Sequence, residues 1–250
     1  MKEEIDNIVY WLKQQVQNAH VNGLLVGVSG GLDSAVVAYL IKQAFPNNSL
    51  GVVMPLKSNS QDIQDAKKVI KNSNIQGMTV DLTATHDSLF SSIQGKLKST
   101  NELIEDTIQL ADANLRARLR MSTLYTLAAN YNYLVVGTDN KSEWYTGYFT
   151  KYGDGGVDIL PIVDYLKSEV VKIGEYLGIP EEVLRKKPSA DLWEGQTDEV
   201  EMGTTYDKID AYLNGVEIPE EDQLIIKKMH RRTEHKRNLA RQFIRYSSLI

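Results

Sequence analysis

Residues 24–34 read LLVGVSGGLDS, a short apolar run that leads into two glycines, an aspartate and a serine. The run is bounded by Gly23 and by Gly30 and Gly31, which is typical of a buried β-strand. Glycines allow a tight turn and let backbone N–H groups approach a phosphate closely. A helix that begins near Asp33 would point its positive N-terminal end at the same place. The stretch therefore predicts a strand, an anion-binding turn and a helix.

This turn differs from two common nucleotide-binding loops. It lacks the lysine of a GxxxxGK[ST] P-loop, and it does not match the GxGxxG dinucleotide pattern. Instead, Asp33 stands at the mouth of the turn, where it would repel a bare phosphate. An acid is favourable there if Mg²⁺ bridges it to the phosphates. The alternative is a plain Gly-Gly turn in which Asp33 caps the helix, and the turn alone does not decide between the two.

Strands and helices alternate along the first half of the chain. Short apolar runs predict buried strands over residues 24–28, 50–54, 78–82 and 133–136, and apolar spacing predicts helices over 3–18, 33–45, 59–72 and 102–130. Buried strands separated by helices are typical of a parallel sheet covered on both faces. We therefore expect an α/β, Rossmann-like doubly wound fold in a single domain, residues 1–250. Ligands should bind at the carboxyl ends of its strands.

The pattern is weaker beyond residue 138. Residues 151–156 and 186–198 are rich in Gly, Pro, Ser and Asp, so they are predicted to be loops. Long polar loops in a compact domain often carry function. A last helix is predicted over 220–232, before a basic tail.

Composition excludes several classes of protein. The chain has 250 residues, a net charge of −5 and no cysteine. Without cysteine there is no disulfide, thiolate metal site or cysteine nucleophile. The negative charge argues against a general nucleic-acid binder. No apolar run reaches the ~18 residues that span a bilayer, and the N-terminus has no secretory signal. We expect a soluble cytoplasmic protein that binds neither nucleic acid nor membrane.

The glycine-rich turn resembles the SGGxDS pyrophosphate loop of the ATP pyrophosphatase superfamily. Its members split ATP into AMP and pyrophosphate and leave an adenylate on the substrate. Further segments resemble, in order, the ammonia-dependent NAD synthetases: residues 137–139 with Glu143, 145–156, 188–192, 206–210 and 235–237. The resemblance implies conversion of nicotinic acid adenine dinucleotide (deamido-NAD), ATP and ammonia to NAD, AMP and pyrophosphate. The synthetase motifs begin within thirty residues of the start, so we expect no glutaminase domain. A separate glutaminase partner is left open.

The resemblance also implies roles for individual residues. It makes Asp33 and Glu143 the Mg²⁺ ligands. ATP is expected to contact Gly27, Val28, Ser29, Gly30, Gly31, Leu32, Asp33, Ser34, Thr138, Lys167 and Ser189. Deamido-NAD is expected to contact Arg118, Lys151, Asp158, His235 and Lys236. A homodimer with its active site near the interface is implied as well, and we expect the helices over 3–18 and 102–130 to lie at that interface.

The chemistry itself needs cations and a base. Lys167 and Lys186 are candidates to stabilise the leaving pyrophosphate. Ammonium must lose a proton before it attacks the acyl adenylate, so a carboxylate should collect it. Asp154 or Asp158 suits that step, and the sequence does not choose between them.

The chain departs from the family pattern at three places. Ser189 replaces a more common threonine, residues 140–142 (Asn-Lys-Ser) replace His-Ala-Ala, and residues 238–240 replace a proline-containing tail.

Arg116 and Arg120 are predicted to form a solvated basic face. Two other functions compete with the one that the resemblance implies. The first is another ATP pyrophosphatase, such as an amidotransferase-type synthetase or a tRNA-thiolating enzyme, and the lack of cysteine disfavours those that need a thiol. The second is a non-catalytic nucleotide sensor, which would not need Asp33 and Glu143 together.

Overall fold

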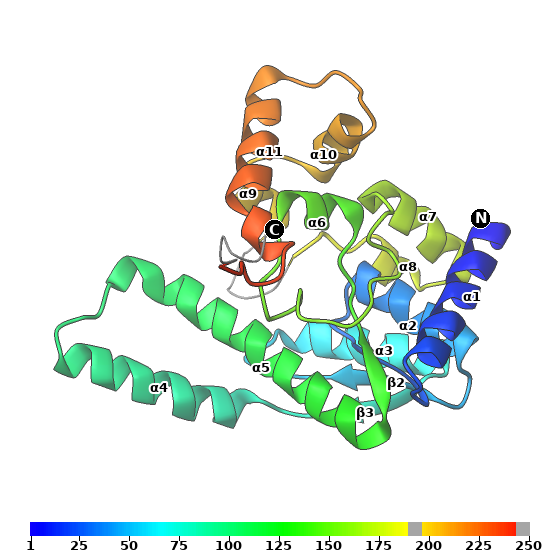
Figure 1. The fold of residues 1–250 in the computed structure, drawn as a ribbon, viewed down its shortest axis with the longest axis horizontal. Helices are drawn as coiled ribbons and strands as arrows, with labels where there is room; N and C mark the ends of the chain where they lie inside the picture. The colour runs from blue at the N-terminus through cyan, green and yellow to red at the C-terminus, as the bar shows by residue number, and fades with distance from the viewer. Residues whose placement is uncertain (190–196, 244–250) are drawn as a thin grey trace, which may run out of the picture.

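Four parallel strands form the centre of the molecule, in the order β3-β2-β1-β4 (Figure 1). They are β1 (Gly23–Gly27), β2 (Ser49–Val53), β3 (Gln76–Thr79) and β4 (Tyr133–Val136). The structure is a computed structural model that describes residues 1–189 and 197–243. Central β1 pairs with both β2 and β4, so that Val26 lies opposite Gly51 and Val136. The turn that follows β1 therefore lies in the middle of the carboxyl edge of the sheet.

Helices cover both faces of the sheet. Leu24 and Val26 point to one face, into a core shared with α1 (Lys2–Asn18), α2 (Leu32–Ala44), α3 (Ser60–Ser73) and α7 (Lys167–Leu177). Leu25 points to the other face, into a core shared with α5 (Ile108–Tyr131). Since side chains alternate along a strand, β1 is buried on both sides. The predicted doubly wound α/β fold is confirmed.

A group of small helices follows β4. They are α6 (Lys141–Thr146), α8 (Glu181–Leu184), α9 (Asp198–Met202), α10 (Tyr206–Leu213) and α11 (Glu220–Arg232). Helices α9 to α11 have a small core of their own, made of Met202, Tyr206, Ile209, Ile218 and Ile226. Figure 1 shows α10 and α11 stacked above α6, which both helices contact. Helix α10 also contacts α7, and α8 contacts α2 and α7.

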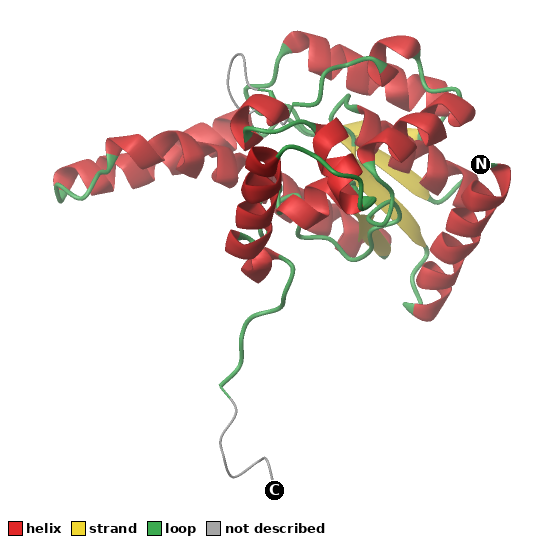
Figure 2. Cartoon of the chain, turned by 90° about the horizontal axis from the view of Figure 1, so that it is seen from above, coloured by secondary structure: helices red, strands yellow, loops and turns green. Residues whose placement is uncertain are grey.

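Helix α5 projects from the body of the protein together with α4 (Thr83–Ser99), joined by a connection that includes a 3₁₀ turn, Glu105–Thr107 (Figure 2). The two helices and their connection carry exposed apolar side chains, among them Leu89, Ile93, Ile104 and Leu110. By contrast, α1 buries its apolar stripe in the main core. Among the described residues, no helix has the length and apolar character needed to cross a membrane.

Some predicted elements are wrong in place or missing. Strand β3 covers 76–79 rather than 78–82, because it is an edge strand with largely exposed side chains and the apolar run lies at its end. The helix predicted from residue 102 begins at Ile108. Helix α4 was not predicted, although Leu89, Phe90, Ile93 and Leu97 recur at helical spacing in it, and His86 is its one buried side chain. Helix α7, which carries Lys167, was not predicted either.

Candidate active site

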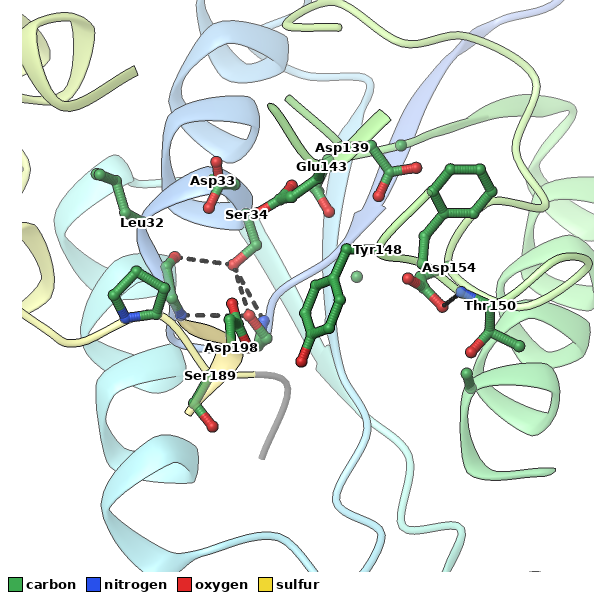
Figure 3. Close-up of a pocket in the computed structure, with 18 of the residues that line it drawn as sticks. Leu32, Asp33, Ser34, Asp139, Glu143, Tyr148, Thr150, Asp154, Ser189 and Asp198 are labelled. Carbon is green, nitrogen blue, oxygen red and sulfur yellow. Dashed lines mark hydrogen bonds between the residues drawn. The ribbon is translucent and has the colours of Figure 1, made fainter. Parts of the chain in front are cut away.

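A cavity of about 1130 Å³ opens at the carboxyl edge of the sheet, where the order of elements predicts a ligand site. Its walls come from the turns after β1, β2 and β4, from α5 and α7, and from the chain on either side of residues 190–196. Figure 3 shows acidic side chains gathered around it. Polar groups at strand ends thus converge on one space.

The glycine-rich turn forms one wall of this cavity. Helix α2 begins at Leu32 with Gly31 as its N-cap, so Asp33 lies in the first turn and the alternative that it caps the helix is wrong. The first helical hydrogen bond runs from Ala35 N to Gly31 O at 3.1 Å. The N–H groups before Ala35 therefore have no helical acceptor and are oriented to bind an anion. Ser34 Oγ braces the turn, since it donates to Gly31 O at 3.0 Å.

Gly30 cannot be replaced by a larger residue in this turn. Its φ is +88°, in the region that favours glycine. A Cβ atom there would also lie 2.5 Å from the carbonyl oxygen of Asp62 in α3. The turn is therefore packed directly on the first turns of α3.

Lys167 lies between two carboxylates beside this turn. Its Nζ contacts Asp33 Oδ2 and lies 3.3 Å from Glu143 Oε1. Burial alone would lower the pKa of Lys167, but the charges of Asp33 and Glu143 outweigh burial and raise it. Burial and the charge of Asp33 raise the pKa of Glu143 to about 7, against the effect of Lys167. The site therefore holds two carboxylates that need a cation between them.

Asn140 fixes the geometry of this cluster. It is fully buried and caps α6, accepting hydrogen bonds from Ser142 N and Glu143 N at 3.0 Å each. Its Nδ2 donates to Asp33 Oδ1 at 2.9 Å, and Glu143 Oε2 accepts from Asn140 N at 3.1 Å. The departure from the family pattern at residues 140–142 therefore supplies the contact that joins both acids. The N-x-x-E pattern of a capping box signals the contact between Asn140 and Glu143, but not the contact with Asp33.

A second set of contacts supports the cluster from α9 and α10. The hydroxyl of Tyr206 lies 3.2 Å from Glu143 Oε1 and 3.0 Å from Asp198 Oδ2. Asp210 accepts from Ser142 Oγ at 2.5 Å and from Ser168 N at 2.9 Å, which fixes the start of α7. The motif at residues 206–210 thus holds Glu143 and Lys167 in place. The motif is recognisable in the sequence, but this role was not predicted from it.

The donor set fits Mg²⁺. No group of three or more His, Asp or Glu side chains in the described ranges could hold a metal ion unaided. Mg²⁺ commonly uses one or two carboxylates together with phosphate oxygens of a substrate and water. Asp33 and Glu143 already bracket a cation, the ammonium of Lys167. They are therefore suited to an ion that takes its remaining ligands from a bound phosphate.

Two more carboxylates lie farther along the cavity. Figure 3 shows Asp139 and Asp154 beside each other, and Asp154 Oδ1 accepts from Thr150 N at 3.0 Å. Asp139 is 4% exposed, and its Oδ2 has no hydrogen-bond partner within the described part of the chain. Burial and the charge of Asp154 raise the pKa of Asp139 well above its usual value. Asp139 belongs to a motif seen in the sequence, but its place in the cavity wall was not predicted.

Asp158 lies elsewhere. It is not part of the cavity wall, and its carboxylate accepts from Tyr125 O–H at 2.9 Å and from Val135 N at 2.8 Å. Arg118 is also outside the cavity and donates to the carbonyl of Lys151 at 3.4 Å. Arg118, Lys151 and Asp158 therefore lie outside the cavity wall, with the Asp158 carboxylate held between β4 and α5.

The C-terminal segment crosses the loop after α6. Lys236 lines the cavity and donates to Gly147 O at 2.8 Å and to Phe149 O at 2.5 Å. Lys151 Nζ contacts His235 O and donates to Asn238 O at 3.1 Å. The changed tail at residues 238–240 therefore still binds the loop through a backbone carbonyl.

Residues 4–240 match a protein-family model described as NAD synthase. The chain belongs to this family. An NH(3)-dependent NAD(+) synthetase from Alkaliphilus metalliredigens (strain QYMF) is 54% identical over 234 residues, which cover 94% of this chain and 95% of the relative. Among solved structures, an NMN synthetase from Francisella tularensis superposes with a TM-score of 0.88 at 40% identity, covering 96% and 97% of the two chains. An NH3-dependent NAD synthetase from Campylobacter jejuni gives a TM-score of 0.76 at 27% identity, covering 97% and 98%.

Within this NAD synthase fold, the structure brings together most of the predicted site residues. The cavity wall contains Gly27, Val28, Ser29, Gly31, Leu32, Asp33, Ser34, Thr138, Glu143, Asp154, Lys167, Lys186, Ser189 and Lys236. Gly30 lies behind the turn, against α3. Arg118, Lys151, Asp158 and His235 are outside this wall.

The prediction of a solvated basic face at Arg116 and Arg120 is wrong. Arg116 forms an ion pair with Asp112. Arg120 lines the cavity and donates to Met54 O and to Ser58 Oγ, at 3.3 Å each. Both arginines turn inward because partly buried acceptors lie within their reach.

Proposed function

We propose that this chain is an ammonia-dependent NAD synthetase, a single-domain ligase that amidates deamido-NAD at the expense of ATP. The observation that carries the proposal is the cluster of Asp33, Lys167 and Glu143 at the N-terminus of α2. It places two metal-binding carboxylates and one ammonium beside backbone N–H groups that can hold phosphate. The curated relative from A. metalliredigens, at 54% identity, carries the same name.

In the first half-reaction the nicotinate carboxylate attacks the α-phosphorus of ATP, and the bond to the β-phosphate breaks. Residues 27–34, Thr138 and Ser189 hold the triphosphate, and Lys167 and Lys186 balance the charge of the departing pyrophosphate. Asp33 and Glu143 would hold Mg²⁺, which supplies further charge neutralisation when bound. Asp33 and Glu143 hold the ammonium of Lys167 beside the phosphate-binding turn. Lys167 can therefore stay close both to the phosphates of ATP and to the departing pyrophosphate without a large movement.

In the second half-reaction ammonia attacks the carbonyl carbon of the adenylate, and the bond to AMP breaks. Ammonium must first give up one proton. Asp154 lines the cavity next to the buried carboxylate of Asp139, whereas Asp158 is engaged outside it. Two neighbouring carboxylates attract a small cation, and the unpartnered Oδ2 of Asp139 leaves one acceptor available. We therefore assign ammonium capture to Asp154 and Asp139.

Asp154→Asn is expected to lower NAD formation about 100-fold at neutral pH, because the variant loses the carboxylate that collects ammonium. Pyrophosphate exchange into ATP in the presence of deamido-NAD should persist, since that exchange needs only the first half-reaction. Asp158→Asn is the matched control and should leave the KM for ammonium unchanged. Equal loss of both half-reactions in Asp154→Asn would contradict this assignment.

The dinucleotide extends beyond the cavity in this proposal. Arg118, Lys151 and Asp158 contact its distal part outside the cavity, and His235 and Lys236 close over it. We also infer a homodimer whose interface uses the exposed apolar side chains of α4 and α5, with the outer contacts close to that interface. A monomer in analytical ultracentrifugation would refute this inference. We place the enzyme in the cytoplasm, with free ammonia as its nitrogen source.

A second substrate is favoured by one observation. The F. tularensis protein described as an NMN synthetase superposes with a TM-score of 0.88, against 0.76 for the C. jejuni NAD synthetase. Formation of NMN would use nicotinic acid mononucleotide, which has the same carboxylate but lacks the adenylate half. The outer contacts at Arg118, Lys151 and Asp158 are unnecessary for that smaller substrate.

The test compares the two substrates with the purified enzyme, ATP, Mg²⁺ and ammonium. We expect kcat/KM for deamido-NAD to exceed that for nicotinic acid mononucleotide at least about tenfold, a difference of ~1.4 kcal/mol in transition-state binding. A preference for the mononucleotide would make nicotinic acid mononucleotide the substrate, while the proposed adenylation and amidation steps would stay the same. Turnover of neither would refute the proposed function.

A further inference from the structure

Lys186, two residues beyond the end of α8, is held by two carboxylates of α3. Its Nζ contacts Asp62 Oδ1 and lies 3.2 Å from Asp65 Oδ2. Asp65 is 4% exposed, and its Oδ1 accepts from Gln61 Nε2 at 2.8 Å. Burial alone would lower the pKa of Lys186, but hydrogen bonds to the two aspartates outweigh burial and raise it. Lys186 therefore stays charged and is fixed in place by partly buried acids.

This part of α3 lies directly behind the glycine-rich turn. A Cβ on Gly30 would lie 2.5 Å from Asp62 O and 2.9 Å from Ala66 N, so the two backbones are in contact. Asp62 and Lys186 also line the same cavity as the turn. A cation held at Asp62 is consequently held beside the place where the phosphates bind.

The segment 186–189 is tethered at a second point. Pro188 O accepts from Asp198 N at 3.2 Å, and the carboxylate of Asp198 lies 3.0 Å from the hydroxyl of Tyr206. Ser189, a proposed ATP contact, follows directly. The position of this segment therefore depends on the pairing of Lys186 with α3 as well as on α9.

We propose that Asp62 and Asp65 are positioning residues for ATP: they hold Lys186, and with it residues 186–189, at the phosphate end of the cavity. This inference rests on the proposed function, in which ATP binds there. The two carboxylates do not touch ATP, which they would repel if they were left without a cation. Their contribution is to order the long side chain of Lys186 before ATP arrives, so that binding costs less conformational entropy.

Asp62→Asn is expected to raise the KM for ATP about fivefold, the upper end of what a partly exposed ion pair contributes. The KM for deamido-NAD and kcat should stay within about twofold of the wild-type values, because neither depends on the position of the Lys186 side chain before ATP binds. A purely structural ion pair would lower the unfolding temperature without separating the two substrates. Asp65→Asn should also raise the KM for ATP. Because Asp65 is buried, the unfolding temperature of this variant is measured as well.

The control is Glu182→Gln. Glu182 of α8 pairs with Lys68 of α3 at 3.2 Å, so it joins the same two helices from an exposed position. This variant should leave the KM for ATP unchanged. In a Lys186→Met background, Asp62→Asn should have no further effect, whereas Lys186→Arg should keep most of the affinity for ATP.

An unchanged or lower KM for ATP in Asp62→Asn, with an active wild type, would overturn the inference. An unchanged KM would mean that the acids do not position Lys186 for ATP, and a lower KM would mean that they compete with the phosphates for it. Failure of the wild type to form NAD would refute the proposed function instead. In that case calorimetric binding of ATP to the wild type and to Asp62→Asn, without a second substrate, still decides the positioning role. Weaker binding by the variant supports it, and equal binding refutes it.

Discussion

Asp33→Asn is expected to lower NAD formation about 1,000-fold while the variant stays folded. The loss of one group that stabilises charge in the transition state typically costs about 10²–10³-fold in turnover, and Asp33 would provide such stabilisation by holding Mg²⁺. Folding should survive because Lys167 keeps Glu143 as a partner at 3.3 Å. The measurement is pyrophosphate release under saturating substrates, together with the unfolding temperature by circular dichroism.

The control for this variant is Asp164→Asn. Asp164 forms an ion pair with Lys141 at 3.0 Å, but its side chain is 88% exposed. Exposed pairs contribute little, so turnover and stability should both stay near the wild-type values. Wild-type turnover in Asp33→Asn would show that Asp33 has no role in catalysis. Loss of folding in this variant would show that its role is structural.

Lys167→Met should abolish measurable activity and also destabilise the protein. Lys167 is 8% exposed and lies between Asp33 and Glu143. Removing one partner of a buried ion cluster leaves uncompensated charge and costs about 3–5 kcal/mol. Added Mg²⁺ should recover part of the lost stability, because a cation bound by the same two carboxylates replaces the missing ammonium.

Thermal unfolding of Lys167→Met with and without Mg²⁺ checks this prediction. Lys141→Met, which removes the exposed partner of Asp164, serves as the control and should show no dependence on Mg²⁺ beyond that of the wild type. If Lys167→Met is as stable as the wild type, or gains nothing from Mg²⁺, the two acids do not form a cation site.

Local signals in the sequence predicted the elements whose formation depends on residues close together in the chain. Strand β4 was predicted with its observed bounds, and the apolar run before Ser29 predicted the central strand to within one residue. Helix α4 carries apolar residues at helical spacing, Leu89, Phe90, Ile93 and Leu97, so its sequence held the signal although the helix was not predicted. Its packing on α5, which buries His86 alone, is what the sequence did not indicate.

The site was predicted where a motif names its residues and was incomplete where contacts join distant segments. Asn140 and Asp33 are 107 positions apart, and Lys186 and Asp62 are 124 apart, so neither pair is visible in the sequence. Asp154 and Asp158 looked equivalent because they share one loop. Only the fold separates them, since Val135 and Tyr125 engage Asp158 while Asp154 lines the cavity.

The central claim is that this cavity adenylates a carboxylate. Its most direct test uses deamido-NAD labelled with ¹⁸O in both carboxylate oxygens, with ATP, Mg²⁺ and ammonium in ordinary water, and mass spectrometry of the AMP. We predict one ¹⁸O atom in each AMP, because the attacking carboxylate oxygen stays on the α-phosphorus when ammonia displaces the adenylate. AMP without ¹⁸O, formed together with NAD, would contradict an adenylated intermediate.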